Sequence, residues 1–217
     1  MTRVLVLHSV SLLRSALAAL LTKEGAFDVS ACGWGTAARL SQTLRPDVCV
    51  VDLDCPGATA LLEGDTEGAV STGTTDITGT TGPTGPILTP RMALLVLASA
   101  GRPGALRRAF EARALGYVDK NGSTHRLVRA IRKVAEGERF IDESLAFGFL
   151  EAARMPLTQR ELSVLSRAAE GESIAEIARG LHLSNGTVRN YMASATRKVG
   201  ARNRIDAIRI SQGAGWV

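Results

Sequence analysis

The chain has 217 residues, of which 45% are hydrophobic, 22% are charged and 4% are aromatic. This composition is typical of globular proteins, and it excludes a collagen-like, disulfide-dense or wholly disordered chain. Lys and Arg number 26 against 21 Asp and Glu, and residues 151–217 hold 10 of the basic and 6 of the acidic side chains. Most of the net charge of +5 therefore lies in the last third, which favours an anionic partner for that part of the chain.

Several classes of protein are excluded by what the chain lacks. Cys32, Cys49 and Cys55 show no CxxC or Cys/His spacing, which argues against a disulfide framework or a zinc site. The apolar run before His8 has four residues, too short for a secretion signal, and no stretch approaches the ~20 apolar residues of a membrane span. No Ser/His/Asp set or glycine-rich phosphate loop is present. We expect a cytoplasmic protein that is not an enzyme and needs no metal, cofactor or membrane.

The first part of the chain alternates short apolar runs with helical patterns. Strands are expected over residues 3–9, 27–33, 47–54, 92–99 and 116–120. Helices are expected between them, at 11–25, 36–44, 58–64, 104–115 and 124–137. In the first helix Leu13, Leu17, Leu20 and Leu21 form one stripe, and the hydroxyl of Ser123 is expected to cap the last. The alternation predicts an α/β fold around a five-stranded, doubly wound parallel sheet.

Residues 64–90 interrupt this alternation. Of these 27 residues, 18 are Gly, Thr or Pro, and the only charges are acidic. Since a segment with so few large apolar groups cannot offset its ordering entropy, we expect a mobile insertion. It is either a tolerated insertion without function or a loop that binds a regulator or partner.

Residues from 155 onward predict four short helices. Thr158 with Glu161, and Ser173 with Glu176, have the spacing of capping boxes, while Ser184 and Asn203 are suited to cap the next two helices. A compact bundle follows from these short turns. Its expected core is Leu162, Leu165, Ile174, Ile177, Ala178, Leu181, Val188, Met192, Val199 and Ile208.

The third of these helices has two chemically different faces. Val188, Tyr191, Met192, Ala195 and Val199 are expected to face the bundle. The opposite face carries Asn185, Arg189, Asn190, Ala193 and Arg197. Arg, Asn and Ala are suited to guanine, adenine and a thymine methyl group in the major groove. Ser184, Thr187 and Lys198 are suited to phosphates. The sequence therefore predicts a helix-turn-helix that binds double-stranded DNA.

Residues 155–212 resemble the LuxR-type helix-turn-helix domain of NarL/FixJ response regulators, in the branch whose recognition helix reads TVRNY. The resemblance implies that Arg189, Asn190 and Ala193 read bases, and that Ser184, Thr187 and Lys198 contact the backbone. It also implies that the last helix, 204–212, is a dimerisation helix. Two copies would then read half-sites about one helical turn apart.

The first part resembles a receiver domain, which implies the strand order 2-1-3-4-5. By this resemblance Asp52 stands at the phosphoacceptor position, Lys120 at the invariant lysine and Tyr117 at the switch aromatic. The receiver pocket departs from the family at three positions. His8 and Ser9 replace the two acids that follow strand one, and Ala98 replaces the strand-four Thr/Ser, with Ser99 one residue later.

These departures predict weak Mg²⁺ binding, because this hard cation demands several oxygen ligands and phosphoryl transfer to aspartate requires it. We expect a transcriptional regulator controlled independently of phosphorylation, by a small-molecule or protein ligand at the receiver or by expression level. A regulator that depends on phosphorylation of Asp52 is the alternative. The expected division is an atypical receiver over residues 1–141, a linker over 142–154 and a DNA-binding domain over 155–217.

Overall fold

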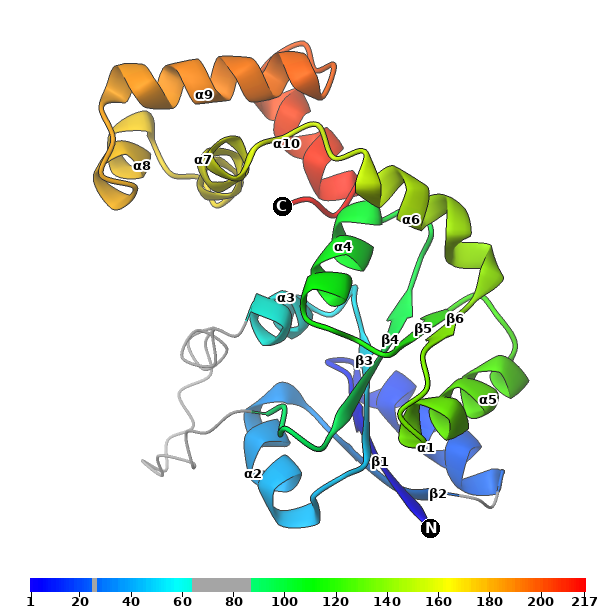
Figure 1. Cartoon of the computed structure of the whole chain (residues 1–217). Coiled ribbons are helices and arrows are strands. Elements are labelled where there is room, and N and C mark those ends of the chain that lie inside the picture. Colours follow the sequence, from blue (N-terminus) through cyan, green and yellow to red (C-terminus); the bar gives the residue numbers. More distant parts are fainter. Residues whose placement is uncertain (25–26, 64–86) are drawn as a thin grey trace. The chain divides into compact units, whose positions relative to one another are not determined.

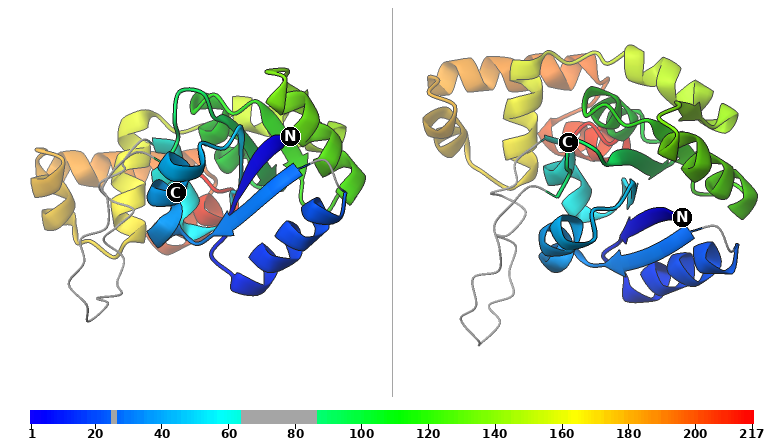
Figure 2. Two further views of the ribbon diagram at one scale, coloured as in Figure 1. Left: turned by 90° about the horizontal axis from the view of Figure 1, so that it is seen from below. Right: turned by 60° about the horizontal axis from the view of Figure 1, so that its bottom comes forward.

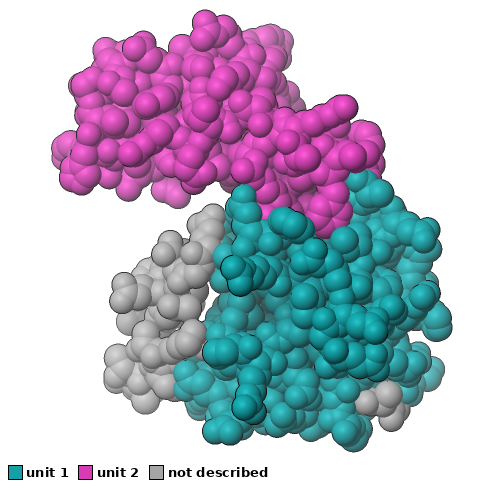
Figure 3. Space-filling view, viewed as in Figure 1, with its two compact units in different colours: residues 1–100, 108–146 teal, residues 101–107, 147–217 magenta. Residues whose placement is uncertain are grey.

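The computed structural model describes residues 1–24, 27–63 and 87–217. The chain divides into two compact units, residues 1–100 with 108–146 (unit 1) and residues 101–107 with 147–217 (unit 2), as Figure 3 shows. Of the expected insertion at 64–90, residues 64–86 lie outside the described residues, so the expectation of a mobile loop concerns a part of the chain that the structure does not describe.

Unit 1 contains a parallel sheet with the strand order β2-β1-β3-β4-β5-β6. The strands are β1 (Thr2–Leu7), β2 (Phe27–Cys32), β3 (Val48–Asp52), β4 (Ala93–Ala98), β5 (Gly116–Asp119) and β6 (Phe140–Ile141). The order 2-1-3-4-5 is confirmed, and the expected count of five strands is corrected to six. β6 pairs with Gly116 and Tyr117 of β5. Its two residues are too few to produce the alternating pattern by which a strand is predicted.

Helices cover both faces of this sheet (Figures 1 and 2). They are α1 (Ser11–Lys23), α2 (Trp34–Leu44), α3 (Pro56–Glu63), α5 (Thr124–Ala135) and α4 (Pro103–Glu111), the last with residues in both units. α1 and α5 lie on one face, with α2 and α3 on the other. Because side chains alternate along a strand, Val4 and Val6 of β1 pack into the cluster with α1 and α5, while Leu5 and Leu7, equally buried, point to the other face.

Two local expectations in unit 1 are wrong. Leu13 is 49% exposed, although Leu17, Leu20 and Leu21 pack as expected against the sheet. Leu13 lies in the first turn of α1. Ser123 occupies the N-cap position of α5, but its side chain makes no capping hydrogen bond. The sequence identifies Ser123 as a suitable capping residue. The rotamer that would form the capping hydrogen bond depends on neighbouring groups that the sequence does not reveal.

Unit 2 consists mainly of helices. After a 3₁₀ turn at Glu143–Leu145 come α6 (Ala146–Ala153), α7 (Gln159–Ala169), α8 (Ile174–Gly180), α9 (Asn185–Lys198) and α10 (Arg204–Gly213). The expected bundle core is confirmed, since all ten of its residues are buried or packed against buried neighbours in two adjoining clusters.

The helix starts of unit 2 follow the sequence closely. Thr158 and Ser173 form complete capping boxes with Glu161 and Glu176. The side chain of Ser184 accepts a hydrogen bond from the backbone N–H of Thr187, and Asn203 caps α10 in the same way. Satisfied backbone donors define where each helix begins, and so fix the length of the turn between α8 and α9.

The turn between α8 and α9 passes through a left-handed residue, His182, with φ of 54°. The N–H of Leu183 donates to the carbonyl of Ala178 at 2.8 Å and closes the end of α8. This conformation is uncommon for residues other than glycine, and histidine is among those that adopt it more readily. The chain can therefore reverse from α8 into α9 within four residues, 181–184.

Candidate functional site

Three of the predicted pocket residues meet at the carboxyl edge of the sheet in unit 1. Asp52 is the last residue of β3, His8 follows β1, and Lys120 follows β5. The carboxyl ends of parallel strands lie along the same edge of a sheet, and β1, β3, β4 and β5 are successive neighbours. The fold thus gathers side chains that are more than a hundred positions apart in the sequence.

The carboxylate of Asp52 is contacted on both oxygens. The Nζ of Lys120 lies 3.3 Å from Oδ1, and the Nε2 of His8 lies 3.6 Å from Oδ2. The backbone N–H of Val10 donates to Nδ1 of His8 at 2.9 Å. Because Nδ1 accepts this bond, we assign the ring proton to Nε2, the nitrogen that faces Asp52. His8 therefore presents an N–H donor to the aspartate, and its side chain is only 6% exposed.

The other predicted pocket residues are less closely associated with Asp52. The hydroxyl of Ser9 donates to Sγ of Cys55 at 3.4 Å, and the carbonyl of Ala98 accepts from the N–H of Lys120 at 3.1 Å. Tyr117 is fully buried, and burial raises its pKa to about 12 against a small opposing effect of Arg139. Ser99 directly follows the end of β4.

Asp54 belongs to this cluster, although the sequence analysis did not select it. Its carboxylate forms an ion pair with Lys120, and its backbone N–H donates to Oδ1 of Asp52 at 2.8 Å. The signal available in the sequence was its spacing of two residues from Asp52. Lys120 therefore bridges two carboxylates, and Asp52 shares its cation with Asp54.

The residues at this edge do not fit a magnesium ion. Mg²⁺ requires an octahedral set of oxygen ligands and is usually held by one or two carboxylates with water. Here the first positions after β1 carry an imidazole and a hydroxyl, and Asp52 and Asp54 are both paired with Lys120. Over residues 1–24, 27–63 and 87–217 no group of three His, Cys, Asp or Glu side chains is arranged to hold a metal.

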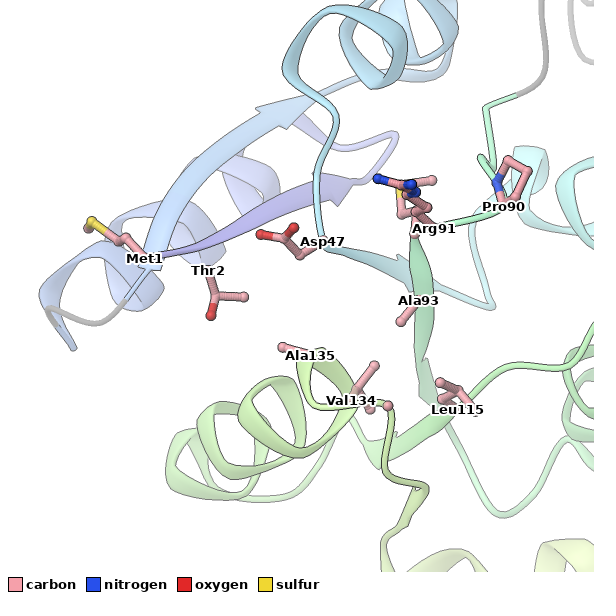
Figure 4. Close-up of a pocket in the computed structure, with 11 residues that line it drawn as sticks. Met1, Thr2, Asp47, Pro90, Arg91, Ala93, Leu115, Val134 and Ala135 are labelled. Carbon is pink, nitrogen blue, oxygen red and sulfur yellow. The ribbon is translucent and has the colours of Figure 1, made fainter.

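A separate hollow of about 440 Å³ lies at the opposite, amino edge of the same sheet (Figure 4). Asp47, Arg91 and Leu115 are among its lining residues. Asp47 is already paired with Arg3, whose guanidinium lies 3.2 Å away. Ligands of open α/β sheets bind at the carboxyl ends of the strands. The cluster around Asp52 lies at that edge of unit 1, whereas this hollow lies at the opposite edge.

In unit 2, the outer face of α9 presents the predicted DNA contacts to solvent. Exposed side chains are Ser184, Asn185, Arg189, Asn190, Ala193, Arg197 and Lys198, and Thr187 is half-buried. The opposite face is covered as expected, since Val188 and Ala195 are fully buried. Within the described part of the chain, no acidic partner lies within ion-pair distance of Arg189 or Arg197. Their guanidinium groups are available to a ligand.

Lys198 differs from these two arginines because its ammonium already has an acidic partner. Nζ lies 2.8 Å from Oε2 of Glu161, a residue of α7 whose side chain is 5% exposed. Burial would raise the pKa of Glu161, but hydrogen bonds from Lys198, Ser194 and Thr158 outweigh it and lower the pKa to about 2. Sequence reasoning recognised Glu161 only as a capping residue, because nothing local indicates a partner 37 positions away.

Comparison with known proteins agrees with both units. The family model described as bacterial regulatory proteins, luxR family, matches residues 155–211. The chain is 51% identical over 219 residues to response regulator RamR of Streptomyces coelicolor, covering 100% of this chain and 98% of RamR. The chain belongs to the LuxR-type response regulators. Another relative in this family, the transcriptional regulatory protein DesR of Bacillus subtilis, is 32% identical over 100% of this chain and 99% of its own.

The fold is also that of a solved LuxR-type response regulator. RcsB from Salmonella enterica serovar Typhimurium, bound to promoter DNA in the presence of the phosphomimetic BeF₃⁻, has a TM-score of 0.60 and 20% identity, with 98% of each chain covered. At this identity the likeness shows the fold alone. The family match and the relatives make this chain a DNA-binding response regulator. No helix among its described residues is long and apolar enough to cross a membrane.

Proposed function

We propose that this response regulator controls transcription without phosphorylation of Asp52. The observation that carries the proposal is the pair of contacts on the Asp52 carboxylate, from Lys120 at 3.3 Å and from the N–H of His8 at 3.6 Å. In a receiver that is phosphorylated, acids beside the phosphoacceptor hold a metal ion, and the metal ion compensates the charge of the incoming group. Here a donor and a cation from the protein itself face the aspartate.

The energetic argument concerns charge. Replacing two acids by His8 and Ser9 removes up to two negative charges from the surroundings of Asp52, so the attraction for a divalent cation falls steeply. Without the metal, the oxygens of a phosphoryl donor would meet two carboxylates, Asp52 and Asp54, that share the cation of Lys120. We infer that transfer to Asp52 is too slow to serve as a signal.

Control then depends on another input. A small molecule or partner protein that contacts His8, Ser9, Asp52 and Lys120 is one candidate, and regulation by the amount of protein is the other. Titration calorimetry with candidate metabolites distinguishes them, because binding at the receiver produces heat that His8→Ala abolishes, whereas control by expression level predicts no heat with any compound.

The output is proposed to be binding of a homodimer to duplex DNA in the cytoplasm, without enzymatic activity. Asn185, Arg189, Asn190, Ala193 and Arg197 lie on the exposed face of α9. The first four have the chemistry that base edges require, and Arg197 is suited to a phosphate. Ser184 and Thr187 lie at its N-terminus, where backbone N–H groups favour a phosphate. We propose residues 1–141 as the receiver, 142–154 as the linker and 155–217 as the DNA-binding domain.

The deciding experiment is incubation of the intact protein with acetyl phosphate and Mg²⁺, followed by mass spectrometry. The proposal predicts no mass gain, and DNA affinity that is the same before and after incubation. A gain of one phosphoryl group that Asp52→Asn abolishes, together with tighter DNA binding, would instead establish the alternative, a phosphorylation-dependent regulator. An orthodox receiver treated in parallel shows that the donor is active.

A further inference from the structure

The carboxylate of Glu161 joins the start of α7 to the last two turns of α9. Oε1 accepts a hydrogen bond from the hydroxyl of Ser194 at 2.6 Å, and Oε2 accepts from Nζ of Lys198 at 2.8 Å. Oε2 also accepts from the N–H of Thr158 at 2.7 Å and from its hydroxyl at 2.9 Å. One buried anion thus has four donors, two from the N-cap of α7 and two from α9.

The spacing of the two α9 donors determines the rotation of this helix. Ser194 and Lys198 are four residues apart and so lie one above the other on the same side of α9. Arg189 and Ala193, two of the proposed base readers, have the same spacing, one residue earlier, and lie on a stripe rotated by about 100°. Fixing Ser194 and Lys198 against Glu161 therefore fixes the direction in which the proposed base-reading stripe points.

The same contacts bear on the expectation that Lys198 binds a phosphate. Removing Lys198 from Glu161 would leave a carboxylate that is only 5% exposed without its cationic partner, which is a large free-energy cost. An exposed phosphate contact returns much less than this, because both partners are well hydrated and screened by salt. A DNA phosphate therefore competes poorly with Glu161 for the ammonium of Lys198.

We infer that Glu161 is a positioning residue for DNA recognition, which orients α9 through Ser194 and Lys198 and keeps Lys198 from contributing a phosphate contact. This inference rests on the proposed use of α9 in DNA binding. It assigns the electrostatic part of the affinity to residues such as Arg197, whose side chain is exposed and has no acidic partner in the described structure.

The test compares the salt dependence of DNA binding for matched variants of the intact chain. Two probes are used, a duplex enriched from a random library by the wild-type protein and a random-sequence duplex of equal length. Loss of one phosphate contact lowers the slope of log K against log [salt] by about 0.9 per bound copy. We expect Arg197→Met to lower the slope by this amount, and Lys198→Met to leave it unchanged while weakening binding to the enriched duplex several-fold.

Glu161→Gln provides the opposite perturbation. It releases the ammonium of Lys198, so the slope should steepen by about 0.9 per copy, while the preference for the enriched over the random duplex falls several-fold. The double variant Glu161→Gln with Lys198→Met should return to the wild-type slope. Loss of folding would not steepen the slope of log K against log [salt] in Glu161→Gln and return it to the wild-type value in the double variant. Thermal melts identify any variant that fails to fold.

The inference is overturned if Lys198→Met lowers the slope as much as Arg197→Met does, or if Glu161→Gln leaves both slope and preference unchanged. A different outcome tests the proposed DNA-binding surface itself. If both Arg189→Ala and Arg197→Met bind the two duplexes as the wild type does, α9 is not the reading helix, whatever the behaviour of Glu161.

Discussion

The Nε2 of His8 lies 3.6 Å from Oδ2 of Asp52, and the opposite nitrogen of the same ring accepts a hydrogen bond from Val10. The orientation of the imidazole is thus fixed by the backbone at the start of α1. A neutral donor occupies a place where response regulators of the orthodox type carry an acid. This replacement of an acid by His8 weakens the attraction of the site around Asp52 for Mg²⁺.

Restoring the acids should restore metal chemistry. The double variant His8→Asp with Ser9→Asp is expected to gain Mg²⁺ binding and to be phosphorylated by acetyl phosphate, because two more oxygen ligands then face the ion. Intact mass spectrometry detects the product, and Asp52→Asn in the same background should prevent it. The interpretation of the pocket is wrong if wild type and double variant react equally fast.

Arg189→Ala should relax specificity at one base pair. A bidentate contact to guanine contributes about 1–3 kcal/mol of discrimination, so affinity for the enriched duplex falls while affinity for a duplex altered at that position is unchanged. Competition binding against all single-base variants measures this. Thr187→Val is the comparison, since removal of a phosphate contact weakens every duplex equally. Uniform losses for Arg189→Ala would exclude it from base reading.

The pairing of Glu161 makes unit 2 sensitive to acid. Its pKa in the folded protein is about 2, against 4.5 for an unperturbed glutamate side chain. The unfolded chain therefore takes up the proton first, so this stabilisation is complete above pH 4.5 and is lost as the pH falls towards 2. Roughly 1–3 kcal/mol should disappear over that interval.

Hydrogen exchange of the amides of α7 and α9 in the intact chain measures this loss. Protection in the wild type should fall over the same pH interval, whereas Glu161→Gln should begin with lower protection and change less. Parallel curves for the two proteins would show that another group is responsible for the acid sensitivity.

Gly116 is expected to tolerate no side chain. A Cβ built there would lie 2.7 Å from Cγ of Leu95 and 2.8 Å from Cγ2 of Val134, both in the packed interior. Gly116→Ala should destabilise unit 1 by about 1–3 kcal/mol through overpacking. In contrast, Gly35→Ala on α2 meets nothing within 4 Å and should be neutral or stabilising. Thermal denaturation followed by circular dichroism compares them, and equal melting temperatures would contradict the packing argument.

Much of the fold was predictable because its signals are local. The capping boxes at Thr158 and Ser173 depend on residues three positions apart, and the apolar stripe of α9 repeats with the helix period. The three central pocket residues were also predictable, since the ends of parallel strands meet at one edge. The resemblance to a receiver domain singled out His8, Asp52 and Lys120, and the topology explains why the three lie together.

Other features were not predictable because they depend on contacts between distant residues. Neither the pairing of Glu161 with Lys198 nor that of Asp54 with Lys120 follows from a local pattern. The charge and position of Lys198 suggest a phosphate contact. Its buried partner, Glu161, is brought next to it only by the packing of the bundle. β6 was missed because two residues carry no periodicity.

The side chain of His182 is exposed, but its left-handed backbone sets the direction in which the chain turns from α8 into α9. β-branched residues are poorly accommodated at φ of 54°, so their introduction would change the crossing angle of the two helices instead of any contact with a partner. A change at this one backbone position would therefore alter how α9 lies against α8 and leave the side chains on the exposed face of α9 unchanged.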